Sequence, residues 1–181
     1  MQESVIRVMQ ALCLVGLASQ PALGTEDPAF RLFDGASIRI SNAVSGEVCS
    51  DADGPAEVCK PGETIDVVGR DMCVWSEDVQ YPCTRYGYEF DFEGANPKAV
   101  ITCKVARSIR TIFGPRTEKV TGENTAEYVV EVPGENGHIF HHGFQTYAPV
   151  EDRVLVHENH ACSYLGEAIY RVVFIHRFEP E

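Results

Sequence analysis

The chain has 181 residues, of which 27 are acidic and 15 basic, and its formal net charge at pH 7 is −12. This acidity argues against a nucleic-acid partner and against binding of anionic lipid through bulk charge, because phosphate groups would be repelled. The length suits one ordinary domain, long enough to bury a core of its own.

Residues 1–24 have the three parts of a cleavable secretory signal peptide. A short polar start (1–7) precedes an apolar run (8–18), and small, turn-prone residues follow (19–24). Cleavage after Gly24 would leave a single domain over residues 25–181. The apolar run is too short to cross a hydrocarbon core of about 30 Å, and a buried amphipathic helix is the alternative. Loss of Glu3 and Arg7 with the leader removes one acid and one base, so the net charge stays −12.

Six cysteines follow the leader, and an even number in an exported chain favours a set of disulfides. Their spacing favours one of the 15 possible pairings. Two pairs would each close a short loop rich in Pro, Gly, Asp and Ser, while the third would be buried and join two sheets: Cys49–Cys59, Cys73–Cys83 and Cys103–Cys162. No Cys-x-x-Cys occurs, which argues against a thioredoxin-type redox site and a zinc ribbon.

The hydrophobic pattern after the leader has a period of two residues. Residues 86–93 alternate aromatic and mainly acidic side chains, the pattern of a half-buried strand, and residues 101–105, 128–132 and 170–178 also alternate. Weaker strands are expected at 36–41, 64–68, 139–147 and 153–157, with Gly, Pro and Asn between the segments. The fold class is therefore all-β, an immunoglobulin-like antiparallel β-sandwich stapled by disulfides, with a small β-barrel as the competitor.

Six histidines lie late in the chain, and they raise the hypothesis of a copper or zinc site built from His141, His142, His157 and His160. On a strand, His141 and His142 point to opposite faces, so one of them would need His157 or His160 across a turn. Hydrogen-bonded or solvated histidines are the alternative. His157 and His160 are spaced one residue too closely for the zinc-protease motif.

The first cysteine loop contains three carboxylates around a glycine turn, which suit a calcium ion: Asp51, Asp53 and Glu57. A complete calcium loop needs more ligands than these, and a solvated acidic turn is the alternative.

A basic segment with interleaved apolar residues lies within residues 104–119 and stands out in so acidic a chain. It predicts a contact surface for an acidic protein or a glycan, formed by Arg107, Arg110, Phe113, Arg116 and Lys119. The alternative is that its apolar residues enter the core while its bases balance neighbouring acids.

No nucleophile elbow or other catalytic motif occurs, so no catalytic residue is predicted. The sequence favours an exported, non-catalytic binding domain of the bacterial periplasm or cell exterior, with an unknown protein or glycan partner. A periplasmic copper- or zinc-binding protein that uses the late histidines is the first alternative, and a small secreted hydrolase is the second.

Overall fold

The computed structural model describes residues 29–34, 36–49, 55–76, 79–110 and 118–180. The expected signal peptide, residues 1–24, lies outside this part. The secondary structure of the described residues consists of strands, and these residues include no helix with the length and hydropathy needed to cross a membrane.

The described residues form twelve strands: β1 (Phe30–Leu32), β2 (Arg39–Cys49), β3 (Glu57–Pro61), β4 (Thr64–Asp66), β5 (Asp71–Ser76), β6 (Val79–Glu93), β7 (Val100–Arg107), β8 (Glu118–Val120), β9 (Thr125–Glu131), β10 (Asn136–Thr146), β11 (Val154–Tyr164) and β12 (Glu167–Phe178).

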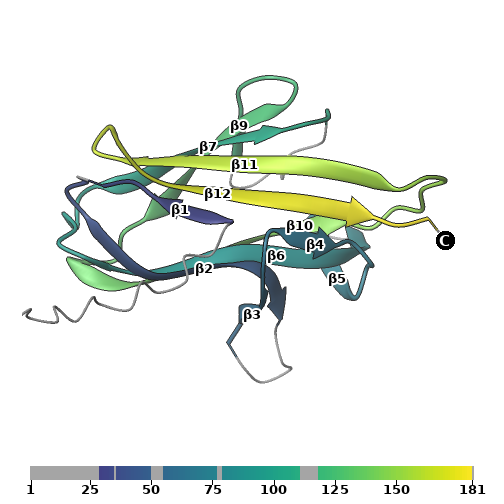
Figure 1. Cartoon of the computed structure of the whole chain (residues 1–181), viewed down its shortest axis with the longest axis horizontal. Coiled ribbons are helices and arrows are strands. Elements are labelled where there is room, and N and C mark those ends of the chain that lie inside the picture. The colour runs from purple at the N-terminus through teal and green to yellow at the C-terminus, as the bar shows by residue number, and fades with distance from the viewer. Residues whose placement is uncertain (1–28, 35, 50–54, 77–78, 111–117, 181) are drawn as a thin grey trace, which may run out of the picture.

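The strands form two layers (Figure 1). Sheet A has the order β1-β12-β11-β7-β9-β8, with β4 parallel to β12, and sheet B has the order β10-β6-β2-β3, with β5 paired to β6. The expected all-β sandwich with disulfides is confirmed. The described residues contain twelve strands, whereas eight were expected from the sequence. The additional strands are either very short or lie in the two cysteine loops, where no strand was predicted.

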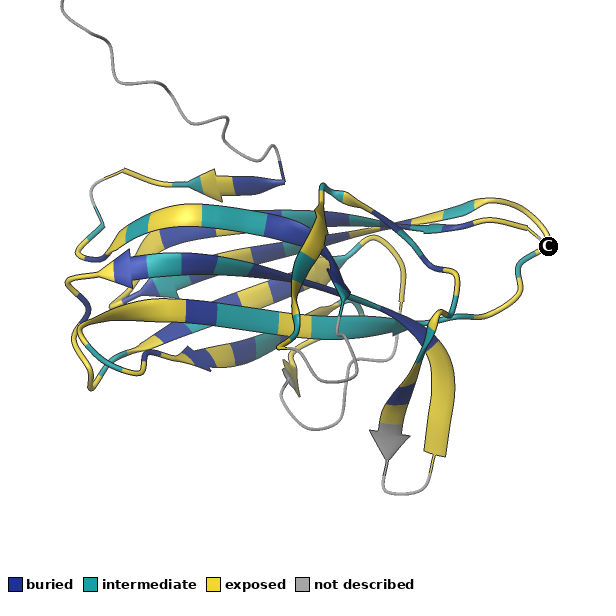
Figure 2. Ribbon diagram, turned by 90° about the horizontal axis from the view of Figure 1, so that it is seen from below, coloured by how far each residue is buried: buried dark blue, intermediate teal, exposed yellow. Residues whose placement is uncertain are grey.

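The core lies between the two sheets and is rich in aromatic rings. On β6, Tyr86, Tyr88, Phe90 and Phe92 all point inward, as their alternation with polar residues predicts, and Tyr88 and Phe90 are fully buried. The ring of Tyr170 on sheet A lies 5.5 Å from that of Tyr88 and 5.2 Å from that of Phe90. The alternation of buried and exposed positions is visible along the strands in Figure 2. Burial of each such side chain contributes about 1.5–3 kcal/mol and fixes how the sheets face each other.

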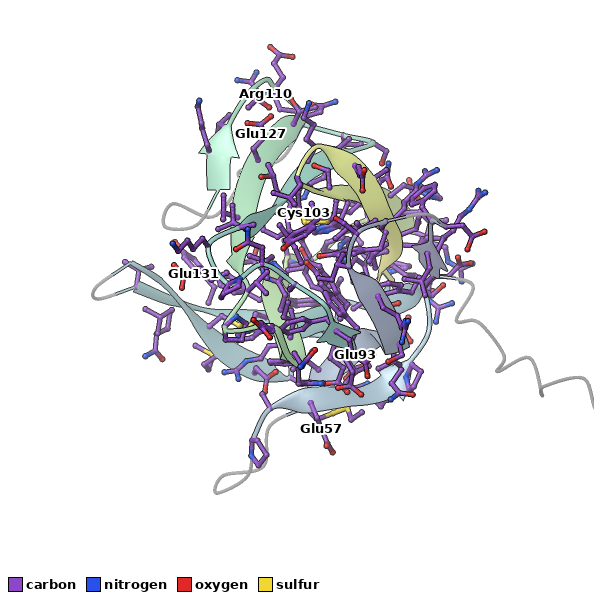
Figure 3. The ribbon with its side chains drawn as sticks, turned by 90° about the vertical axis from the view of Figure 1, so that its left-hand side faces the viewer. Glu57, Glu93, Cys103, Arg110, Glu127 and Glu131 are labelled. Atoms are coloured by element: carbon purple, nitrogen blue, oxygen red, sulfur yellow. A yellow bond between two sulfur atoms is a disulfide. The ribbon has the colours of Figure 1, made fainter. Side chains whose placement is uncertain are left out.

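All three expected disulfides are present: Cys49–Cys59, Cys73–Cys83 and Cys103–Cys162. The expectation that Cys103–Cys162 joins the two sheets is wrong. Cys103 on β7 lies directly opposite Cys162 on β11 within sheet A, with their Cα atoms 4.1 Å apart. Residues opposite each other on neighbouring antiparallel strands come close enough for a disulfide, so an inward-facing pair does not need the second sheet. Cys103 lies among the interior side chains in Figure 3, whereas Glu57 lies near the rim. Three intramolecular disulfides indicate an oxidising environment of the extracellular type.

Strand β11 extends well beyond the segment 153–157 expected from the sequence. It continues through the late histidines to Tyr164 and turns into β12 through Leu165 and Gly166, both with positive φ (50° and 87°). Positive φ at both central residues is typical of a type I′ hairpin turn. The region around His157 and His160, expected to be strand and turn, is therefore one continuous strand whose alternate side chains enter the core.

Candidate functional site

A fully buried carboxylate, Glu158 on β11, is the centre of a polar cluster between the sheets. Its Oε1 accepts hydrogen bonds from the Tyr86 hydroxyl at 2.8 Å and from His160 Nε2 at 2.6 Å. Its Oε2 is paired with Arg107 Nε, and the Arg107 side chain is only 7% exposed. Both oxygens therefore have partners, which offsets the cost of burying the charge.

The cluster continues through a row of tyrosine hydroxyl groups. His160 Nδ1 lies 2.8 Å from the Tyr128 hydroxyl, which lies 3.0 Å from that of Tyr88. The Tyr88 hydroxyl is 2.9 Å from that of Tyr170, and this last oxygen is 3.5 Å from Cys103 Sγ in the buried disulfide. When the proton of His160 is on Nε2, its Nδ1 accepts a hydrogen bond from the Tyr128 hydroxyl. One chain of hydrogen bonds then crosses the interior.

The surroundings shift the pKa of several of these groups. Burial alone raises the pKa of Glu158, but hydrogen bonding to His160, the nearby imidazole of His176 and the charge of Arg107 together outweigh it and hold the pKa well below its ordinary value. Burial raises the pKa of three phenols well above the ordinary value of 10, and the charge that a neighbouring phenolate would carry raises it further: Tyr88, Tyr128 and Tyr170. The site therefore holds one carboxylate anion among neutral phenols.

His176 on β12 is fully buried beside this cluster, and neither of its ring nitrogens has a hydrogen-bond partner in the described structure. Its Nε2 lies 3.6 Å from Glu158 Oε2, beyond hydrogen-bond distance. Its ring packs 4.4 Å from that of Tyr86. An unsatisfied buried nitrogen is costly, so this position is where the cluster is least well matched.

The Glu–His–Tyr arrangement contains groups that can move protons, but its burial argues against catalysis. The side chains of Glu158 and His160 are 0% and 5% exposed, and a general acid or base has to reach a proton on its substrate. The cluster instead fixes the register of five strands, β6, β7, β9, β11 and β12, because each of them contributes a group whose loss would leave a partner unsatisfied.

The four histidines of the metal hypothesis are dispersed. His141 points inward from β10 and stacks on Tyr128 at 4.5 Å, and burial, followed by the charge of His160, lowers its pKa to about 3. His160 has both ring nitrogens engaged within the cluster. His142 and His157 are exposed on strands of different sheets. In the described ranges no three His, Cys, Asp or Glu residues are grouped closely enough to hold a metal ion, and the copper or zinc site stays a prediction.

The calcium residues can be placed only in part. Glu57 is exposed at the start of β3, while Asp51 and Asp53 lie outside the described residues. The calcium site therefore stays a prediction.

The basic contact surface is also described only in part. Arg107 enters the interior and pairs with Glu158. This residue therefore fits the alternative expectation, in which the bases of the segment balance neighbouring acids. Arg110 and Lys119 are exposed, and Lys119 borders a shallow depression on the outside of sheet A. Phe113 and Arg116 lie outside the described residues, so the surface as a whole stays a prediction.

A projecting apolar hairpin that was not predicted from the sequence is formed by β5 and the start of β6, with described residues 71–76 and 79–83, and we call it the β5–β6 hairpin. Among the described strands, the part of β6 before Cys83 pairs with β5 alone, whereas β2 and β10 pair with later residues. Four large apolar side chains on it are exposed: Met72 (54%), Val74 (53%), Val79 (39%) and Tyr81 (46%). The cysteine spacing indicated only a loop here, although Met72 and Val74 flanking Cys73 already show the alternation of a strand.

No protein-family model matches the chain, and neither a curated protein nor a solved structure is detectably similar to it.

Proposed function

We propose that the protein is an exported, non-catalytic binding domain that contacts a partner protein through the β5–β6 hairpin. The observation that carries the proposal is the exposure of four large apolar side chains on this one short element. Apolar groups gathered on a surface mark interaction sites, whereas single exposed hydrophobic residues need no explanation.

The hairpin presents apolar groups on both of its faces. Tyr81 lies opposite Cys73 in the register, so the two side chains share a face, while Met72 and Val74 point to the other face. An element that is apolar on both sides suits insertion into a pocket better than attachment to a flat surface.

The base of the hairpin is held firmly, which lowers the entropy lost on binding. Cys73 is bonded to Cys83, and Tyr147 N donates to Pro82 O at 2.8 Å. Thr84 Oγ1 accepts hydrogen bonds from the backbone amides of Val68 and Gly69 at 3.0 and 3.3 Å. The hairpin is thus preorganised on a rigid sheet.

Charge favours a protein partner with basic residues around an apolar pocket. The chain carries a net charge of −12, and Glu77 and Asp78 join the two strands in the sequence. These charges oppose binding to an anionic membrane surface and favour a partner with basic residues at the rim.

Two finer assignments accompany this proposal. The three disulfides and the signal-like sequence of residues 1–24 support export to the periplasm or the cell exterior. The two antiparallel layers support an immunoglobulin-like version of the sandwich, which we retain as part of the proposal.

Site-specific photo-crosslinking in an exporting host tests the contact. A photoreactive phenylalanine analogue replaces Tyr81, and Val129 on the outside of sheet A, 56% exposed, is the matched control position. We expect one discrete protein adduct from position 81 and none from position 129. The purified partner should bind Met72→Asp at least about tenfold more weakly than the wild type, because a buried apolar side chain contributes about 1.5–3 kcal/mol. Equal adducts from both positions, no adduct, or attachment of the protein to neutral phospholipid vesicles would contradict the proposal.

A further inference from the structure

Met72 carries the one readily oxidised sulfur outside residues 1–24, the expected signal peptide. Residues 25–181 contain six cysteines and a single methionine. All six cysteines are bonded in disulfides, so none of them presents a thiolate to an oxidant. A mild two-electron oxidant such as a peroxide therefore has one sulfur target in this part of the chain, the thioether of Met72.

Met72 is also accessible in the folded protein. It is 54% exposed, and Val74, its neighbour on the same face of the β5–β6 hairpin, is 53% exposed. An oxidant can thus reach the sulfur without any opening of the fold, whereas a methionine in the aromatic core would react only when the chain unfolds.

We propose that Met72 is an oxidation site, and that a peroxide acting on it switches off the partner contact of the β5–β6 hairpin. The sulfur lone pair attacks one oxygen of hydrogen peroxide, an S–O bond forms as the O–O bond breaks, and proton transfer releases water. Sulfur gives up two electrons, the peroxide takes them up, and the product is methionine sulfoxide. Methionine sulfoxide reductases reverse the change at the expense of a dithiol reductant, so the site has two states.

The sulfoxide alters the hairpin face on which Met72 lies. Oxidation turns an apolar side chain into a polar one whose oxygen accepts hydrogen bonds. Pro82 is its cross-strand neighbour in the register and has no N–H to donate, so water solvates this oxygen in the free protein. A partner pocket suited to apolar side chains would have to remove that water, and burial of an unpaired polar group is unfavourable. Oxidation should therefore weaken the contact while the fold stays intact.

Peptide mapping after treatment of the folded protein with dilute hydrogen peroxide tests the oxidation site without a partner. We expect Met72 to gain one oxygen atom while the three disulfides stay intact, at a rate that rises less than about tenfold when the chain is unfolded in urea. Ile101→Met, made in the Met72→Leu background, is the buried control, because Ile101 is fully buried in the core. Its new methionine should react only on unfolding.

Photo-crosslinking then measures the effect on the contact. Purified protein with the photoreactive analogue at position 81 is returned, oxidised or unoxidised, to an extract of the exporting host at sub-saturating concentration. We expect the discrete adduct to fall at least about tenfold on oxidation and to return after treatment with methionine sulfoxide reductases. Met72→Leu keeps an apolar side chain of similar volume and has no sulfur to oxidise, so its adduct should survive the same peroxide treatment.

Resistance of Met72 to peroxide in the folded protein would overturn the inference. It would also be overturned by an adduct that is unchanged after complete oxidation of Met72, or by one lost equally from Met72→Leu, since that loss would belong to another residue. Control by oxidation rests on the proposed function of the hairpin, and the two fail in different ways. A protein that forms no adduct before oxidation refutes both, whereas an adduct that withstands oxidation refutes the control alone.

Discussion

Replacement of the buried carboxylate by its amide, Glu158→Gln, tests the polar cluster most sharply. The substitution keeps the shape of the side chain but removes its charge. The new amide would still accept one hydrogen bond, from Tyr86 or from His160, while Arg107 would keep its buried guanidinium without a carboxylate.

The magnitude follows from the contacts that are lost. A hydrogen bond to a charged group contributes roughly 1.5–3 kcal/mol and a neutral one about 1 kcal/mol, and breaking a buried ion pair costs roughly 3–5 kcal/mol. Because one acceptor survives, we expect the free energy of unfolding to fall by about 3–5 kcal/mol. Glu179→Gln is the matched control: Glu179 lies 3.0 Å from Arg153 in an exposed pair, with side chains 44% and 63% exposed, and its loss should cost less than about 1 kcal/mol.

Urea unfolding at pH 7 with intact disulfides measures both variants, and an unchanged m-value licenses the comparison. The pH dependence provides a second check. The pKa of Glu158 is lower in the folded state than its ordinary value of 4.5, so its contribution is complete above that value and is lost as the pH falls through the folded pKa. The difference between wild type and Glu158→Gln should therefore shrink in acid. A cost at pH 7 no larger than that of Glu179→Gln would refute the reasoning.

Three further predictions concern the core. His176→Phe should raise the free energy of unfolding by about 1 kcal/mol, because it removes two buried nitrogens without hydrogen-bond partners. A loss of that size in urea unfolding would instead indicate that His176 interacts favourably with Glu158, 3.6 Å away. Gly87→Ala should cost about 1–3 kcal/mol, because the new Cβ would lie 2.3 Å from the His141 carbonyl oxygen; unchanged stability would contradict this tight spacing of β6 and β10. Three of the seven tyrosines, Tyr88, Tyr128 and Tyr170, should ionise only on unfolding when alkaline difference spectroscopy follows the titration. The free energy of unfolding should fall above pH 10, because the folded state keeps these phenols protonated. Ionisation of all seven tyrosines before unfolding would contradict the burial of these three.

The strands that could be predicted are those whose inward residues are all apolar. On β6, aromatic residues alternate with mainly acidic ones, and the structure follows this pattern. On β11, the inward positions include Glu158 and His160, which look like exposed residues in a sequence. The alternation was hidden there, and the strand was predicted to end several residues too early.

The polar cluster could not be predicted, because its members come from distant parts of the chain. Tyr86, Arg107 and Tyr128 lie on three different strands, and only the packing of the sheets brings them to Glu158 and His160. The cysteine spacing did predict the three bridges, since two of them are local and the third pair remains. It could not show that the third bridge lies within one sheet, nor that the second closes an exposed hairpin.

The crosslinking yield from position 81, measured in parallel in the wild-type background and with Met72→Asp, tests the central claim most directly. Met72 is more than half exposed, so the substitution should leave the fold and the thermal midpoint unchanged. We predict a discrete adduct that is lost with Met72→Asp and is suppressed by an excess of unlabelled wild-type protein. An adduct that persists unchanged in the Met72→Asp background would contradict a binding function of the β5–β6 hairpin.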